Sequence, residues 1–184
     1  DGLIDAAVDH WGSNKGREIA NRYRGKFPSS YRDNFEPKLA VKDIELLSSL
    51  EQGNELAMSF YRPDGIAKNV MRFKLFHFQS QLELSKMVPM LEQLGFRVLG
   101  EHPYPITTIL GETIWLHDFT LLFGLDVDVD VSAIRNTFEE AFSAVSRNIA
   151  ESDSFNRLVL GARLDWRIVS LLRLYARYMK QIRF

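Results

Sequence analysis

The 184-residue sequence contains no cysteine, which excludes disulfide bridges and thiolate metal ligands. Its net charge of −1 gives no general attraction to nucleic acid or to an anionic membrane. The histidines lie in different expected elements without the spacing of a metal site: His10, His77, His102 and His117. We therefore expect no metal, no nucleic-acid partner and no membrane partner, and the lack of cysteine fits a cytoplasmic location.

Long apolar runs and glycine-rich motifs are also missing. No apolar run approaches the roughly 20 residues that cross a membrane, and the N-terminus lacks the pattern of a signal peptide. The phosphate-binding patterns GxGxxG and GxxxxGK(S/T) and the nucleophile motif GxSxG are absent. We expect neither catalytic residues nor a cofactor-binding site in this segment.

The apolar pattern that is present changes its period along the chain. Residues 3–53 carry apolar side chains at helical spacing. Residues 56–61 and 70–78 alternate as strands, with Met71, Phe73 and Leu75 facing a core and Lys74 on the polar side, and we expect them to form an antiparallel hairpin.

A second set of elements follows the hairpin. We expect a helix over residues 84–95 with Ser85 as its N-cap and two strands over residues 96–106 and 113–123. A helix over residues 132–149 follows, with Ser132 as its candidate N-cap and Ile149 on its apolar face. Two further helices end the sequence, and Asp165 is the expected N-cap of the last one.

The expected order is therefore helices, then ββαββα, then helices. A ferredoxin-like unit has the order βαββαβ, and moving its last strand to the front produces ββαββα. We predict an α+β fold with a ferredoxin-like four-stranded antiparallel sheet in this permuted order, flanked by N- and C-terminal helices. The predicted divisions are a helical linker at residues 1–53, the ferredoxin-like domain at residues 54–150, and helices at residues 151–184.

Apolar side chains lie on both expected faces of the sheet. In the strand over residues 113–123, Ile114 and Leu116 belong to one face, whereas Trp115 and Phe119 belong to the other. An antiparallel sheet with one solvated face would alternate with polar residues. We therefore expect the flanking helices or a second copy of the domain to cover the other face.

The polar residues in the strands have structural explanations. His117 and Asp118 are adjacent on one strand, so they point to opposite faces and cannot act as a pair, and we place them at the sheet surface or a protomer contact. Pro103 and Pro105 belong at a sheet edge or a strand end, packed by Tyr104. A ligand contact by the neighbouring Glu101 or His102 is the alternative interpretation.

The last helix carries both basic and apolar residues. Arg173 and Arg177 belong to its basic set, which leaves RNA binding as an alternative function. Its wide apolar band instead favours packing against other parts of the same chain. Because the sequence begins with Asp1 and ends in a helix without a stop signal, we expect both ends to be cuts through a longer protein.

Four blocks of sequence together carry a resemblance. "PMLEQLGFRVLGEHPYPI", "IWLHDF", "FEEAFSAV" and "FNRLVLGARLDWRIVSLLRLYARYMKQ" occur in this order. As a set they resemble the large bacterial NAD-specific glutamate dehydrogenases, in the region of ACT-type regulatory domains before the catalytic domain. The resemblance implies a parent enzyme that oxidises L-glutamate with NAD to 2-oxoglutarate and ammonia, whose catalytic residues and NAD site lie beyond Phe184.

The resemblance also implies partners and an effector site. The partners would be the catalytic and other regulatory domains of the same chain, in a homo-oligomer, together with an amino-acid effector. In ACT domains the loop after the first strand contacts the amino acid, and the matching residues here are Gln79, Ser80, Gln81 and Ser85. An ordinary surface loop at residues 77–85, in a domain that serves only packing or oligomerisation, is the alternative.

Overall fold

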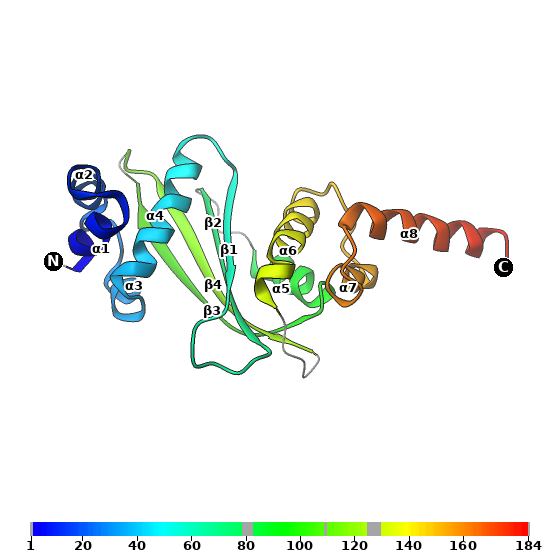
Figure 1. The fold of residues 1–184 in the computed structure, drawn as a ribbon. Coiled ribbons are helices and arrows are strands. Elements are labelled where there is room, and N and C mark those ends of the chain that lie inside the picture. The colour runs from blue at the N-terminus through cyan, green and yellow to red at the C-terminus, as the bar shows by residue number, and fades with distance from the viewer. Residues whose placement is uncertain (1, 79–82, 109, 125–129, 184) are drawn as a thin grey trace. The chain divides into compact units, whose positions relative to one another are not determined.

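The computed structural model describes residues 2–78, 83–108, 110–124 and 130–183, and Figure 1 shows the fold. The N-terminal helices are α1 (Gly2–Trp11), α2 (Ser13–Tyr23), α3 (Ser29–Asn34) and α4 (Pro37–Glu51). The central elements are β1 (Leu56–Tyr61), β2 (Val70–Phe78), α5 (Leu84–Gln93), β3 (Phe96–Thr107), β4 (Thr113–Phe123) and α6 (Val131–Ser146). The C-terminal elements are the 3₁₀ helix η1 (Ser154–Asn156), α7 (Arg157–Gly161) and α8 (Trp166–Gln181).

The four strands form one antiparallel sheet in the order β1-β2-β4-β3. The predicted α+β, ferredoxin-like class is confirmed, and the hairpin neighbours β1 and β2 are paired. This is the order that arises when the last strand of a βαββαβ unit is moved to the front. Pro103 and Pro105 lie in the edge strand β3, where a missing N–H costs little, although the strand continues past both prolines to Thr107.

Contacts divide the chain into two compact units, each of which has its own core. The first unit contains residues up to Ser59, residues from Lys74 to the end of β2, and His102–Asp118. Its helices α1 and α2 cross closely, because a Cβ atom on Gly16 would lie 2.4 Å from the carbonyl oxygen of Ala7. Only glycine fits this crossing without a shift of the backbone.

The core of the first unit joins α4 to the strands. Ile44 and Leu47 of α4 pack in one buried cluster with Phe76 of β2 and Leu116 of β4. Helix α4 therefore packs on apolar strand residues, in agreement with the expectation that flanking helices cover the second apolar face of the sheet. The alternation in residues 56–61 predicts that Leu56, Met58 and Phe60 face inward and that Ala57 faces away from the core. Ala57 of β1 instead belongs to this buried cluster, which corrects that expectation.

The second unit has an aromatic core. It contains Phe60–Phe73, Leu82–Glu101 and Phe119–Phe184. Phe138 of α6 lies with its ring centre 4.6 Å from that of Phe60 and 5.0 Å from that of Phe73. These interlocking rings fix α6 against the strands.

Asp130, and not Ser132, caps the N-terminus of α6. The Asp130 carboxylate accepts hydrogen bonds from the backbone N–H groups of Ser132 at 3.0 Å and Ala133 at 3.3 Å. Because α6 begins and ends earlier than expected, Ile149 lies beyond the helix and is 62% exposed. The prediction for α8 is confirmed, since the Asp165 carboxylate accepts from the N–H of Arg167 at 2.7 Å.

The N-cap of α5 also differs from the predicted one. Glu83 is the residue before the helix, and Ser85 lies inside the first turn, so Ser85 is not the N-cap. Among the helices of the described ranges, none combines the length and the hydropathy needed to cross a membrane.

Candidate functional site

The predicted effector stretch is only partly described by the structure. Gln79, Ser80 and Gln81 lie outside the described residues. Ser85 is exposed on the first turn of α5. His77, which begins the stretch at the end of β2, is only 4% exposed.

His77 and His117 form a buried pair on neighbouring strands. Their rings are parallel within 5° with centres 5.2 Å apart. Burial, with a smaller contribution from His117, lowers the pKa of His77 to about 4. His117 and Asp118 are both fully buried, so their expected position at the sheet surface is wrong. Among the described residues, no three potential ligands gather to hold a metal ion.

Asp43, Lys74 and Tyr31 form a buried polar cluster in the first unit. The Lys74 ammonium pairs with the Asp43 carboxylate, and the Tyr31 hydroxyl donates to the same carboxylate at 2.6 Å. Lys74 is 1% and Asp43 3% exposed, and Lys74 also lies 3.9 Å from the centre of the Phe35 ring. Burial raises the pKa of Asp43, whereas Lys74 acts in the opposite direction. The pair therefore ties α4 to β2 inside the core, and the expected polar side for Lys74 is wrong.

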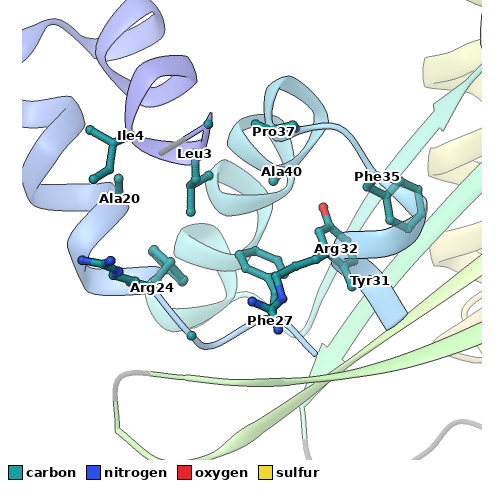
Figure 2. A pocket seen from close by; sticks show the side chains of 13 residues that line it. Leu3, Ile4, Ala20, Arg24, Phe27, Tyr31, Arg32, Phe35, Pro37 and Ala40 are labelled. Atoms are coloured by element: carbon teal, nitrogen blue, oxygen red, sulfur yellow. The ribbon is translucent and has the colours of Figure 1, made fainter. Parts of the chain in front are cut away.

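A cavity of about 400 Å³ lies among α1–α4 (Figure 2). Its lining is mainly apolar, with Leu3 and Ile4 from α1 and Phe27, Tyr31 and Phe35 from α3 and its flanks. The cavity also includes two arginines, Arg24 and Arg32, which are both exposed. A concave apolar hollow with a few polar groups is the usual form of a small-molecule site.

The wall of this cavity reaches the sheet through aromatic contacts. The ring centres of Tyr31 and Phe35 each lie 5.7 Å from that of Tyr104 on β3, in edge-to-face geometry. The Asn34 amide also donates to the Tyr104 hydroxyl at 3.3 Å. The role of Tyr104 as a packing residue is confirmed, and its partners are the cavity residues.

A second hollow, of about 470 Å³, lies in the second unit. Arg97 and Arg157 line it together with Glu92, Phe96 and Phe123. Both charge signs meet in this hollow, so it differs chemically from the cavity among α1–α4.

Three glutamate dehydrogenase family models match the chain in succession. A model for helical motif 2 matches residues 6–50, a model for the ACT3 domain matches residues 55–134, and a model for helical motif 3 matches residues 150–184. The ACT3 match contains all four strands and α5.

Three curated relatives are each called NAD-specific glutamate dehydrogenase. The protein of Halomonas elongata is 40% identical over 184 residues, that of Pseudomonas aeruginosa 42% over 183 residues, and that of Mycobacterium tuberculosis 30% over 190 residues. Each match covers 100% of this chain but 11% of the relative. The chain thus spans about one ninth of the length of these relatives.

Proposed function

Because the chain belongs to the glutamate dehydrogenase family through its ACT3 domain and helical motifs 2 and 3, we propose that it is a noncatalytic regulatory segment of an NAD-dependent glutamate dehydrogenase. The parent enzyme of this proposal oxidises L-glutamate with NAD to 2-oxoglutarate, ammonia and NADH in the cytoplasm. Its other regulatory domains and its catalytic domain are the partners of this segment. The parent forms a homo-oligomer.

The observation that carries the proposal is the match of the ACT3 model to the whole permuted sheet, at residues 55–134. ACT domains commonly bind amino acids, so the proposed effector is an amino acid. The proposed contacts are Gln79, Ser80, Gln81 and Ser85. The proposal is supported by Ser85, which is exposed on the first turn of α5 and is therefore accessible to a ligand.

The proposed organisation keeps three parts. Residues 1–53 serve as a helical linker, residues 54–150 as the ACT-type domain, and residues 151–184 as helices that lead toward the catalytic domain.

A second candidate function, packing between domains or protomers, is favoured by α8. Val169 and Arg173 are buried and Arg173 binds Asp153, with its Nε 2.6 Å from Oδ2. On the other side of α8, several large apolar side chains are exposed: Ile168, Leu171, Leu172, Leu174, Tyr175, Tyr178, Met179 and Ile182. A helix with such a face is suited to packing against another protein surface.

The same anchoring weakens the nucleic-acid alternative. Arg173 pairs with Asp153, and Arg177 pairs with Glu151. Both guanidinium groups therefore already bind carboxylates of the second unit. Replacing Arg173 and Arg177 by neutral residues would therefore test these ion pairs of the fold more than it would test an RNA contact.

A thermal-shift screen of the 184-residue chain against the twenty amino acids at millimolar concentration tests the proposed effector site. A ligand of the folded state stabilises it by RT ln(1 + [L]/Kd), about 2.7 kcal/mol at a hundredfold excess over Kd. We expect one or two L-amino acids to raise Tm and their D-enantiomers to leave it unchanged.

Variants then locate the site. Gln79→Ala and Gln81→Ala should remove the shift, whereas Gln181→Ala, at the end of α8, should keep it. A flat response to all twenty amino acids would contradict effector binding by this chain and leave the packing function as the better explanation.

A further inference from the structure

The exposed apolar side chains of α8 have the spacing of a coiled-coil seam. Along the helix and its C-cap, five of them recur at alternating steps of three and four residues: Ile168, Leu171, Tyr175, Tyr178 and Ile182. This is the spacing of positions a and d of a heptad, whose side chains insert between those of a partner helix in a coiled coil. The five side chains of this seam are 46–58% exposed, so the described part of the chain leaves the seam open.

The opposite side of α8 is held by its own unit. Val169 and Arg173 are buried there, and the Arg173 guanidinium binds the Asp153 carboxylate. Arg177 lies one turn further along the helix and pairs with Glu151. Both arginines lie outside the seam, and carboxylates of the same unit balance their charges. The seam therefore faces away from the contacts that hold the helix.

The C-terminal half of α8 lacks packing of this kind. Every residue from Leu174 to Arg183 is exposed, on all sides of the helix. A helix of fewer than about 12–15 residues is marginal in water, and most helices in proteins are stabilised by packing of an apolar face. A partner that covers the seam would therefore stabilise this half of α8.

The exposed apolar face is as large as one side of a stable interface. Leu172, Leu174 and Met179 flank the seam and are also exposed, which widens the face to eight large apolar side chains. At about half exposure each, these side chains present on the order of 800 Å², the area that one partner buries in an interface of standard size. The face is therefore large enough to hold two chains together.

The residues beside the seam determine which helix can approach it. These are positions e and g of the heptad, which often carry the charges that select one partner and repel another. The uncharged residues at these positions are Leu172, Leu174, Met179 and Gln181. Arg167, the charged residue among them, pairs with Asp165 of the same chain. Two copies of α8 can therefore meet without like-charge repulsion along the seam.

The charges at the two ends of α8 favour an antiparallel arrangement of the copies. Lys180 and Arg183 are exposed at the C-terminal end, and a parallel pair would bring these cations of the two copies together. An antiparallel pair separates them. It also brings Lys180 of each copy toward Asp165, the N-cap of the other helix.

We propose that α8 is a self-association surface, through which two copies of this chain form an antiparallel coiled-coil pair. At the centre of the pair, Leu171 of each copy packs beside Tyr175 of the other. Further out, Ile168 of each copy packs beside Tyr178 of the other. The inference rests on the packing function proposed above and names the partner of that surface, a second copy of the chain.

Sedimentation velocity of the 184-residue chain over a series of protein concentrations, from low micromolar to submillimolar, tests the proposal. We expect the average mass to rise with concentration from that of one chain to that of two. Leu171→Glu should raise the dissociation constant of the pair about thirtyfold or more, because each copy then places an unpaired carboxylate in the contact.

Ile149→Glu is the matched control, because Ile149 is a large apolar residue of the second unit that is 62% exposed outside α8. This variant should associate like the unaltered chain. The mass of one chain at every concentration, or equal dissociation constants for the two variants, would overturn the proposal and assign the face to a different partner. If Leu171→Glu fails to fold, the concentration series of the unaltered chain still decides.

Introduced cysteines report the orientation, because the sequence has none of its own. With oxidised glutathione as the oxidant, a mixture of Ile168→Cys and Tyr178→Cys should form a disulfide between the two variants. Ile182→Cys should not cross-link to itself, and efficient self-linkage of this variant would contradict the antiparallel arrangement. None of these measurements depends on an effector. A chain that stays monomeric but binds an amino acid would refute the self-association and leave the proposed regulatory function standing.

Discussion

Replacement of His77 by phenylalanine should reduce the pH dependence of the stability of the fold. In the folded chain the His77 ring is buried beside His117, and the pKa of His77 is lowered from 6.5 to about 4. The unfolded chain therefore binds more protons than the folded chain between these pH values. The free energy of unfolding consequently rises with pH in this range.

The size of the effect follows from the shift. The difference between 6.5 and about 4 corresponds to about 3 kcal/mol at about 1.4 kcal/mol per pKa unit. This stability is fully present above about pH 6.5 and is lost as the pH falls toward 4. Phenylalanine keeps a flat ring at the same position and has no proton to bind.

Urea unfolding at pH 7.0 and at pH 4.5, for the unaltered chain and for His77→Phe, measures the effect. Acidic side chains titrate in both proteins, so the difference between the two pH dependences isolates His77. We expect the variant to lose about 2 kcal/mol less than the unaltered chain over this interval. Identical losses would refute the assignment of a lowered pKa to the buried ring.

Three further predictions concern packing and polar contacts. Gly16→Ala should destabilise the chain by about 1–3 kcal/mol in urea unfolding, because the added Cβ would lie 2.4 Å from the backbone of α1; an unchanged midpoint would contradict the close helix crossing. Lys74→Met should lower the free energy of unfolding by about 3–5 kcal/mol, because it leaves Asp43 buried without its cation. The double variant Asp43→Leu/Lys74→Met should recover much of this loss. Equal stability of the single and double variants would argue against a buried pair. Asp130→Ala should cost about 1 kcal/mol, seen as a fall in Tm of about 2–4 °C, and a larger fall for Ser132→Ala would show that the cap is wrongly assigned.

The sheet could be predicted because its apolar side chains follow a simple period. Met71, Phe73 and Leu75 alternate over β2, and all three are buried as expected. This alternation, together with the end of a helix near Gly95, predicts the order of the elements. The order of the elements in turn predicts the permuted ferredoxin-like arrangement. Periodic patterns predict secondary structure well where the apolar side chains of one element all face the same core.

Cap residues and buried polar residues could not be predicted as well. Ser132 and Asp130 both have side chains that can cap a helix, and only the backbone positions show that Asp130 receives the N–H groups. Lys74 occupies a strand position that looks solvent-facing, and its partner Asp43 is 31 residues away on α4. Tertiary pairing of this kind leaves no periodic signal in the sequence.

The cavity among α1–α4 could not be predicted from the sequence either. Its residues come from four helices and the turns between them, and each of them has an ordinary local explanation as a packing residue. A signal was present in the four-residue spacing of Phe27, Tyr31 and Phe35 beside Arg24 and Arg32. That spacing also describes a helix packed on a core, so the sequence could not separate a cavity wall from a filled interior.

Isothermal titration of the 184-residue chain with each amino acid that raises Tm tests the central claim most directly. The regulatory assignment predicts saturable heat with at least one L-amino acid and the loss of that heat in the variant Gln79→Ala/Gln81→Ala. No heat with any amino acid at millimolar concentration, from a chain whose folded state is verified by its Tm, would contradict the claim that this ACT-type domain is itself an effector-binding module.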